Sequence, residues 1–556
     1  MLALRAMDVR QAFRSELGLL GAVVVGAAIR LDQIREQIVL DDEWHALHAI
    51  LRFGYGRILT HFGWTDVCIP LAVFDKVVAD TVGLSEMWMR LPVLLAGIAS
   101  LLVLPLMLRA WLEHSATTSL AWLLAVSPLH VFFSRFARPY AISLLLVMVG
   151  GLAFARWWEH GRPRWKALCM GGFVLGPYFH LSVLPVVLAT IALGLAEAAG
   201  WRRSSARRPR EVALLAVEVA LGLAVLVGVP LAVDHAALAY KAGRARLGAP
   251  MAAGVLELMA GTARRPLLMA LVALVLAGGL VLARERPRLL ALLAAMALAV
   301  PVAILAARPV SVDEPIVAAR YCLVVLPVAL LLAAVALARG EQWLRARIGA
   351  WPPGTLTALA VVGLFVAGPL PRLHARPNNW THHGSFQYAY DPARLDWRCP
   401  PEVPRFYREL ATRPPASLRL LEAPWWHAWE NVYFPCYQQV HRQYMAIGFV
   451  APPERAASPS GLPRAAELPL LAPGRSFRFR NFVHVSDEPG LRRRGIRYVV
   501  FHRSLEEEMG VDSADYRVDI APWLAYYRSR YGTPVYEDGA VVVFDVDRPP
   551  AGGGAR

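Results

Sequence analysis

Charged residues are scarce in this sequence. They make up 18% of its 556 residues, and lysine occurs only at Lys76, Lys166 and Lys241. The five cysteines show none of the paired spacings that hold structural zinc. Because 56% of the residues are hydrophobic, the composition excludes an ordinary soluble enzyme. It indicates a protein that crosses a membrane several times.

Apolar runs of roughly membrane-spanning length follow one another over the first 371 residues. They lie near residues 17–31, 90–108, 118–133, 140–155, 166–179, 181–199, 211–233, 266–283, 289–307, 320–338 and 355–371. A helix needs about 20 residues to cross the hydrocarbon core, and short runs can extend into flanking polar residues. The sequence therefore predicts about eleven transmembrane helices.

The positive charge is concentrated in short loops. The formal net charge is +16, and nearly all of the alternate loops, at about residues 109–117, 156–165, 200–210, 284–288 and 339–354, are rich in arginine. Short arginine-rich loops mark the cytoplasmic face, so this charge needs no nucleic-acid partner. Arg5, Arg10 and Arg14 keep the amino end inside as well. An odd number of spans then places everything after about residue 371 on the exported side.

The composition changes abruptly near residue 372. Residues 372–556 have ordinary polarity and enough length to bury a core. Apolar stretches at 418–422, 496–501 and 541–544 predict strands, and the sequence Glu-Asp-Gly at 537–539 predicts a hairpin turn. We predict a small α/β domain after a membrane domain of residues 1–371. Cys399 and Cys436 both fall in this exported domain, where an oxidising compartment permits a disulfide without requiring one.

The first predicted exported loop, about residues 32–89, opens with an acidic cluster. Asp41, Asp42 and Glu43 follow one another and precede Trp44 and His45. The amphipathic pattern over residues 46–59 predicts a helix that lies along the membrane surface. Ionisable residues at a membrane boundary usually have a partner or a function. We therefore interpret the cluster as part of an active site.

Three further predicted exported loops carry cationic and aromatic side chains. They are the sequence Ser134 to Tyr140 with Arg135 and Arg138, the break at His180 after Gly176 and Pro177, and the pair Arg320–Tyr321. Arginine stays charged and binds phosphate through two hydrogen bonds at once. A carboxylate facing several fixed arginines suits a reaction in which one group loses a proton and another loses a phosphate.

The order of these motifs resembles the C-type glycosyltransferase superfamily, in particular its family 39, the protein mannosyltransferase and aminoarabinose transferase-like group. Four patterns carry the resemblance over about residues 15–340: the Asp42–Glu43 pair, residues 83–95 with Arg-Leu-Pro at 90–92, Ser-Pro-Leu-His at 127–130 leading to Arg138-Pro139-Tyr140, and Arg320–Tyr321 before Pro327. The resemblance implies an α-helical polytopic fold in the bacterial inner membrane, with the tail exported.

The resemblance also implies a reaction of the cell envelope. A polyprenyl-phosphate sugar is the donor, and a lipid, glycan or protein hydroxyl or amine is the acceptor. Because the lipid phosphate leaves readily once cations meet its charge, a single base suffices and the anomeric carbon is inverted. We assign Asp42 as that base and Glu43 as its positioning neighbour. The residues expected to bind the donor phosphate are Arg138, Arg320, His180, Arg135, Tyr140 and Tyr321.

A divalent metal is compatible with this arrangement but is not required by it, and no metal ligands are assigned. Each site residue also has a structural alternative: the acids as a helix cap, Arg135 and Arg138 as anchors of span ends, Arg320 as a partner of Asp313 or Glu314, and His180 as the partner of a nearby carbonyl. A transporter or flippase of a lipid-linked substrate, or a noncatalytic membrane scaffold, would share the same topology. The sugar and the acceptor stay open.

Overall fold

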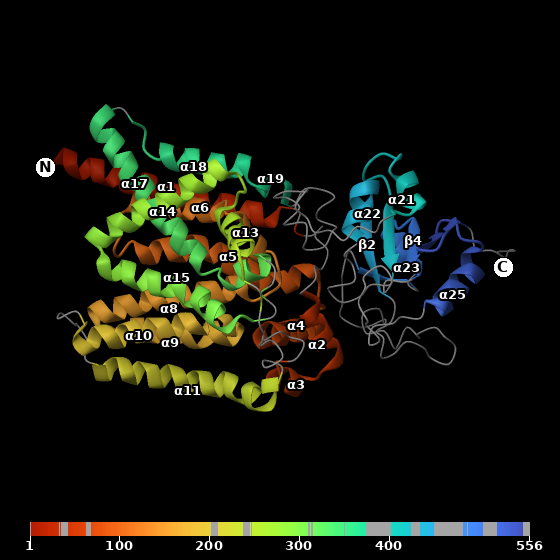
Figure 1. The fold of residues 1–556 in the computed structure, drawn as a ribbon, viewed down its shortest axis with the longest axis horizontal. Coiled ribbons are helices and arrows are strands. Elements are labelled where there is room, and N and C mark those ends of the chain that lie inside the picture. Colours follow the sequence, from red (N-terminus) through yellow and green to blue (C-terminus); the bar gives the residue numbers. More distant parts are fainter. Residues whose placement is uncertain are drawn as a thin grey trace. The chain divides into compact units, whose positions relative to one another are not determined.

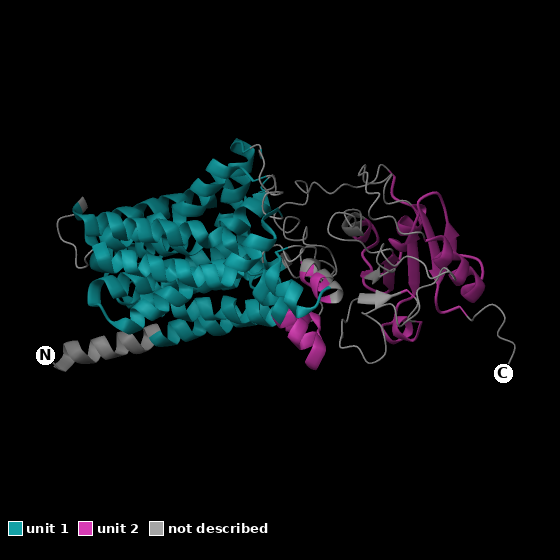
Figure 2. Cartoon of the chain, turned by 90° about the horizontal axis from the view of Figure 1, so that it is seen from below, with its two compact units in different colours: residues 1–32, 52–73, 90–371 teal, residues 33–51, 74–89, 372–556 magenta. Residues whose placement is uncertain are grey.

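The structure is a computed structural model of the whole chain. It describes residues 2–32, 34, 43–62, 68–201, 209–236, 245, 247–309, 312, 315–349, 351–373, 402–423, 434–449, 482–485, 488–503 and 520–548. The chain folds into two compact units (Figure 2). The helical unit comprises residues 1–32, 52–73 and 90–371, and the sheet unit comprises residues 33–51, 74–89 and 372–556.

The helical unit is built from long apolar helices (Figure 1). Seven helices of the described residues have the length and composition to cross a membrane, so the chain is a multi-pass membrane protein. The runs of residues that contain them are Glu86–Leu108 (α5), Tyr140–His160 (α8), Leu181–Gly200 (η2, Leu181–Val183, with α10, Leu184–Ala196, and the start of η3, Glu197–Trp201), Pro209–Val233 (α11), Arg265–Glu285 (α14), Pro287–Ala307 (α15) and Val325–Ile348 (α17).

The predicted number of eleven spans is not confirmed. Residues 118–133 fall in two short helices, α6 (His114–Ala125) and α7 (Pro128–Phe133), because Pro128 begins a new helix there. The run at 166–179 lies in α9 (Pro163–Phe179), and the run at 355–371 lies mainly in α18 (Thr355–Ala367). The first run lies in α1 (Leu2–Leu31), a long helix with several charged residues in its first half.

Shorter helices complete the part of the chain before residue 374. They are α2 (Glu43–Arg52), α3 (Tyr55–Thr60), α4 (Ile69–Thr81), α13 (Ala249–Ala260), α16 (Pro315–Tyr321) and α19 (Leu370–Leu373). The predicted surface helix at 46–59 is therefore two helices, which are separated at Phe53 and Gly54. Glycine, which has no side chain to pack and is a poor helix former, favours such a break.

Small residues let the membrane helices approach closely. In the contact between α8 and α9, a Cβ atom on Gly172 would collide with the carbonyl oxygen of Leu146. At the α14–α17 crossing, a Cβ atom on Gly278 would overlap the carbonyl oxygen of Leu332. Because lipid tails are as apolar as leucine, close van der Waals packing of this kind is a main source of helix association in a bilayer.

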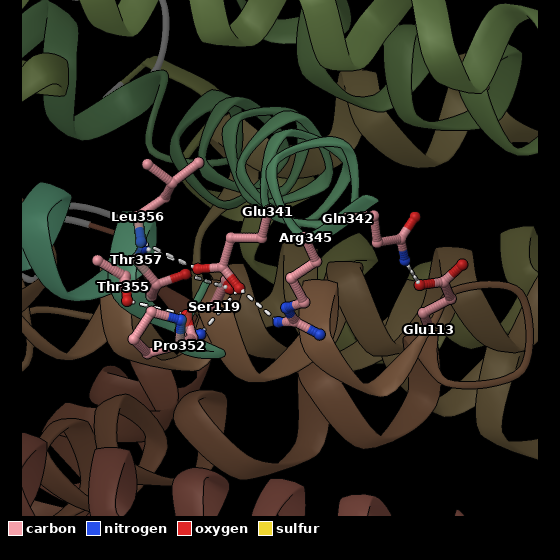
Figure 3. A network of polar contacts seen from close by, with 10 residues as sticks. Glu113, Ser119, Glu341, Gln342, Arg345, Pro352, Thr355, Leu356 and Thr357 are labelled. Atoms are coloured by element: carbon pink, nitrogen blue, oxygen red, sulfur yellow. Dashed lines mark hydrogen bonds and ion pairs between the residues drawn. The ribbon is translucent and has the colours of Figure 1, made fainter. Parts of the chain in front are cut away.

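A buried carboxylate closes the turn between α17 and α18 (Figure 3). Glu341 is 3% exposed and accepts hydrogen bonds from the backbone N–H groups of Gly354, Leu356 and Thr357. These are first-turn N–H groups of α18, which no helical carbonyl can satisfy. Arg345 pairs with the same carboxylate at 3.1 Å. Glu341 therefore caps α18 from the preceding helix.

The sheet unit contains a six-stranded mixed sheet, as the predicted α/β domain requires. Its order is β3-β2-β1-β4-β6-β5, and its strands are β1 (Arg419–Ala423), β2 (Tyr444–Phe449), β3 (Phe482–His484), β4 (Tyr498–His502), β5 (Tyr536–Glu537) and β6 (Val541–Asp545). Strand β1 pairs in parallel with β2 and β4, β2 pairs in parallel with β3, and β6 is antiparallel to β4 and β5. The three predicted strands and the β5–β6 hairpin are confirmed.

Both faces of this sheet are covered, which explains why β4 and β6 are buried along their whole length. Helices α21 (Arg405–Leu410) and α22 (Phe434–His441) supply Tyr407 and Tyr437 to the cluster that contains Leu420 and Val500. Helix α25 (Ala521–Tyr531) packs Tyr527 against Phe501 and Phe544 on the other face. A further helix, α23 (Glu488–Arg493), precedes β4. Cys399 and the side chain of Cys436 lie outside the described residues.

Candidate active site

Four of the six side chains predicted to bind phosphate come together at the ends of three helices. Tyr140 begins α8, His180 follows α9, and Arg320 and Tyr321 end α16. The ring centroids of Tyr140 and His180 are 5.1 Å apart, and that of Tyr321 is 6.2 and 5.7 Å from them, respectively. The guanidinium carbon of Arg320 lies 5.5 Å from the Tyr140 ring and 5.3 Å from the Tyr321 ring.

This aromatic–guanidinium cluster is held in place by cation–π and ring contacts, which are strongest where water is excluded. Tyr140 and His180 are 3% and 5% exposed. The Nδ1 atom of His180 accepts a hydrogen bond from the backbone N–H of Ser182 and lies 2.6 Å from the Ser182 hydroxyl. The predicted break at His180 is confirmed, because the backbone there is extended and a new helical turn starts at Leu181.

Arg135 and Arg138 lie in the short connection between α7 and α8 and are almost completely buried. The Nη1 atom of Arg135 donates to the carbonyl oxygens of Ile29, Arg30 and Asp32, at 3.3, 3.2 and 2.5 Å. These bonds close the carboxyl end of α1, whose last carbonyls lack helical donors. Arg138 stands two residues before Tyr140 and is 1% exposed.

Burial lowers the pKa of Arg135, but the guanidinium stays charged. Desolvation, followed by the nearby Arg90, lowers the pKa of Arg135 to about 9, while Asp32 raises it. A pKa of about 9 leaves the guanidinium charged at neutral pH. A buried charge of this kind must be compensated by hydrogen bonds or by an opposite charge.

Arg30 makes the reciprocal contact and was not predicted as a site residue. Its guanidinium, fully buried, donates to the carbonyl oxygens of Leu124 and Ala125 at the end of α6, at 3.2 and 3.1 Å. It also donates to the Ser134 hydroxyl at 3.2 Å and lies 2.7 Å from Nδ1 of His130. In the sequence, Arg30 is an arginine near the end of an apolar run. Such an arginine usually extends its side chain along the apolar surface to reach the membrane interface.

We name the interlocked Arg30 and Arg135 side chains the arginine clasp. Arg30 reaches from α1 to the end of α6 and to α7, and Arg135 reaches from the α7–α8 connection back to the end of α1. A Cβ atom on Gly97 in α5 would collide with Ser134, so α5 packs directly against the start of the α7–α8 connection. The clasp therefore fixes the chain segment that carries Arg138 and Tyr140.

The acidic part of the predicted site belongs to the sheet unit. Asp42, the predicted base, lies outside the described residues, whereas Glu43 begins α2 and is 1% exposed. Asp75 in α4 is also buried, and its Oδ1 atom has no hydrogen-bond partner among the described residues. Burial, and then the neighbouring Glu43 carboxylate, raises the pKa of Asp75 well above its usual range. Asp75 is thus a candidate site residue that the sequence did not point to.

A signal for Asp75 exists in hindsight. The residues one helical turn before and after it, Leu71, Ala72, Val78 and Ala79, are all buried, so an acid stands on the apolar face of α4. An acid in that position needs a partner or keeps its proton. Across the part of the chain that the structure describes, no group of three His, Cys, Asp or Glu side chains is placed to hold a metal ion.

Loops predicted to be cytoplasmic also meet one another, away from the aromatic–guanidinium cluster. Arg339 of α17 pairs with Glu113 before α6 and with Glu285 at the end of α14. Trp111 donates to Glu159 at the end of α8, whereas Tyr140 starts the same helix at the aromatic–guanidinium cluster. A helix of this length separates its two ends by about 30 Å. The two sets of loops therefore occupy opposite ends of the helical unit.

Comparison with known proteins gives structural neighbours only. No protein-family profile and no curated protein match the sequence. Two crystal structures of ArnT from Cupriavidus metallidurans are similar in fold. One, bound to undecaprenyl phosphate, is 13% identical, covers 95% of this chain and 97% of its own, and has a TM-score of 0.44. The other, in the apo state, is 15% identical, covers 97% and 98%, and has a TM-score of 0.45.

A third neighbour is the apo oligosaccharyltransferase of Archaeoglobus fulgidus. It is 14% identical, the match covers 96% of this chain and 75% of that chain, and the TM-score is 0.42. ArnT is an aminoarabinose transferase, which is one of the groups that the four sequence patterns resemble. Both kinds of neighbour are C-type membrane glycosyltransferases.

Proposed function

We propose that this protein is an inverting glycosyltransferase that takes a sugar from a polyprenyl-phosphate donor and transfers it to an acceptor on the exported face of a bacterial inner membrane. The observation that carries the proposal is the meeting of Arg320, Tyr140, His180 and Tyr321 at one end of the helical unit. These groups come from segments far apart in the sequence. Their convergence supports a common ligand with an anionic head.

The chemistry of these groups suits a lipid phosphate. Arg320 is fixed against two rings, so its N–H groups are held in one orientation before the ligand arrives. Arg138 supplies a second guanidinium two residues before Tyr140, and the arginine clasp holds that segment. Charge-assisted bonds from guanidinium to phosphate are among the stronger hydrogen bonds in proteins. We assign Arg320 and Arg138 as the principal phosphate ligands, with His180, Tyr140 and Tyr321 as supporting groups.

In the proposed reaction, Asp42 accepts the proton of the acceptor hydroxyl or amine as that atom attacks the anomeric carbon. The bond from the anomeric carbon to the phosphate oxygen breaks, and both of its electrons stay on the phosphate. The arginines meet the charge that develops on the leaving phosphate, so no second acid is needed. Burial and the neighbouring Glu43 carboxylate raise the pKa of Asp75, so in the proposal Asp75 keeps its proton and adds no negative charge beside Glu43.

Arg135 has a different role in the proposal from the one that its sequence position suggested. Its Nη1 atom already donates to the carbonyl oxygens of Ile29 and Arg30 in α1 and of Asp32 just after it. We propose that Arg135 contributes positive charge to the site while it holds the end of α1. A divalent metal is not part of the proposed mechanism.

A transfer assay tests the proposal. Membranes with the wild-type protein or Asp42→Asn are incubated with polyprenyl-phosphate sugars, and released polyprenyl phosphate is measured. We expect Asp42→Asn to abolish release at an unchanged expression level. A noncatalytic scaffold does not use the Asp42 carboxylate. A cell that shows the wild-type phenotype with Asp42→Asn would therefore favour the scaffold alternative. Transfer by Asp42→Asn at the wild-type rate would remove Asp42 from the mechanism.

Mass analysis of cell-envelope glycans would identify the substrates. A strain that lacks this protein should lack one sugar residue on one lipid, glycan or protein. That missing residue would name both the donor sugar and the acceptor. An unchanged glycan profile with an altered lipid distribution across the membrane would instead favour a flippase.

A further inference from the structure

A buried histidine beside the arginine clasp has one ring nitrogen without a partner. His130 lies in α7 and is 1% exposed. Its Nδ1 atom lies 2.7 Å from Nη2 of Arg30, whereas its Nε2 atom has no hydrogen-bond partner among the described residues. His130 is not one of the residues to which the sequence assigned a role in binding the donor.

The contact with Arg30 fixes the tautomer of this ring. A guanidinium N–H can only donate, so Nδ1 of His130 must accept and cannot carry a hydrogen. The neutral ring then has its hydrogen on Nε2. The structure therefore presents a buried N–H donor on the edge of the ring that faces away from Arg30.

The buried Nε2–H group of His130 requires a hydrogen-bond acceptor. Leaving a buried N–H without an acceptor is costly, and native proteins rarely do so unless water or a ligand completes the bond. The surroundings favour an anion over a neutral ligand. Within the described residues, the hydrogen-bond partners of the Arg30 guanidinium are uncharged: carbonyl oxygens, the Ser134 hydroxyl and the His130 ring. The charge of the Arg30 guanidinium therefore has no anionic partner among these groups, and it lies in a medium of low dielectric constant.

We propose that His130 donates its Nε2–H to an anionic oxygen of the donor's lipid-linked phosphate, and that Arg30 holds the ring in the tautomer that can do so. This inference rests on the proposed function. His130 stands eight residues before Arg138, in the segment that the arginine clasp fixes. It would be a further phosphate-binding residue, and Arg30 would be its positioning residue.

Two substitutions separate the two nitrogens of the ring. Asparagine places an acceptor where Nδ1 stands but does not reach the position of Nε2. Glutamine places an N–H donor near the position of Nε2 but offers Arg30 no acceptor at the position of Nδ1. His130→Asn should therefore keep the bond from Arg30 and lose the ligand contact, and His130→Gln should do the opposite.

The test measures the Kd of the purified full-length protein for undecaprenyl phosphate, with a thermal melt of each variant. We expect His130→Asn to melt like the wild type and to bind about tenfold more weakly or worse, because a hydrogen bond to a charged group is lost. His130→Gln should melt at a lower temperature and bind within about threefold of the wild type. His114→Asn, which changes an exposed histidine at the start of α6, is the matched control and should change neither value.

Other outcomes would overturn the inference. Wild-type affinity in His130→Asn would mean that Nε2 is satisfied by water only. Loss of inorganic phosphate binding without loss of undecaprenyl phosphate binding would assign the residue to free phosphate. If the wild type itself bound no undecaprenyl phosphate, the proposed function would fail, and the inference with it.

A measurement on the wild type guards against misfolding of the variants. In protein labelled with 15N-histidine, the protonated Nε2 signal of His130 should shift when undecaprenyl phosphate is added. A signal that does not move under saturating lipid would contradict the proposal independently of any variant.

Discussion

The two units of this protein bury charge in different ways. In the helical unit, the Arg30 guanidinium is satisfied mainly by backbone carbonyls, two of which end α6. In the sheet unit, the buried Glu422 carboxylate bonds the side chains of Tyr407 and His502, each at 2.9 Å. A helix that ends inside a membrane domain leaves carbonyls without donors, and a guanidinium can serve several of them at once. A sheet has few such carbonyls, so its buried charge needs side-chain partners.

This difference has a consequence for substitutions. A pair of side chains can be replaced together by apolar residues, because both members of the interaction disappear. A side chain that bonds the backbone cannot, since the carbonyls remain. The helical unit should therefore tolerate the loss of its buried charge less well than the sheet unit does.

The largest effect is expected for Arg30→Met. Removing the guanidinium leaves the Leu124 and Ala125 carbonyls and His130 without their donor, which should cost about 3 kcal/mol or more. The yield and melting temperature of the purified protein measure this loss. Arg284→Met, at an exposed position near the end of α14, is the control and should cost less than about 0.5 kcal/mol. Equal melting of the two variants would mean that the clasp is not a support of the fold.

A smaller effect is expected in the sheet unit for Glu422→Leu. The substitution leaves the Tyr407 hydroxyl and His502 buried without their acceptor, at a cost of about 2 kcal/mol. The double variant Glu422→Leu/His502→Leu should recover part of that stability, as a double-mutant cycle can show. Strictly additive losses would contradict the contrast drawn between the units.

The pH dependence of the sheet unit should come in part from His441. Burial lowers the pKa of His441 to about 3, against 6.5 in an unfolded chain. Between these values the unfolded state binds a proton that the folded state does not, so stability falls as the pH drops below 6.5. The slope should reach up to about 1.4 kcal/mol per pH unit. His441→Asn keeps an acceptor for the Gln443 N–H and should lose this slope in melts between pH 7 and pH 4.5.

The smallest effect is expected for Ser134→Ala. It removes one neutral partner of Arg30 and should cost about 1 kcal/mol in a thermal melt. Its effect should nearly vanish in the background of Arg30→Met, because residues in one network are not additive. An equal cost in both backgrounds would show that Ser134 acts apart from the clasp.

Local patterns were sufficient to predict much of the fold. The runs Tyr-Val-Val-Phe at 498–501 and Val-Val-Val-Phe at 541–544 are rich in β-branched and aromatic residues, and both are strands. In strand β2, Met445, Ala446 and Gly448 interrupt such a run, and this strand was not predicted. The run at 118–133 looked continuous by hydropathy, but Pro128 begins a separate helix in it.

In the candidate site, too, some residues were predictable from the sequence and others were not. The distribution of charge predicted that Tyr140, His180 and Arg320 lie on the same side of the membrane. In the structure, Tyr140 contacts both His180 and Arg320. The arginine clasp was not predictable, because Arg30 meets its partners 94 to 104 positions away in the chain. Only the three-dimensional arrangement shows that Arg135 bonds the end of α1.

Binding of undecaprenyl phosphate to the wild type and to Arg320→Gln tests the central claim most directly. The wild type should bind this lipid saturably, and Arg320→Gln should bind it at least about tenfold more weakly, because a charge-assisted contact to phosphate is lost. Both proteins should melt at similar temperatures. Equal affinity in the two proteins, or no binding by the wild type, would contradict the account.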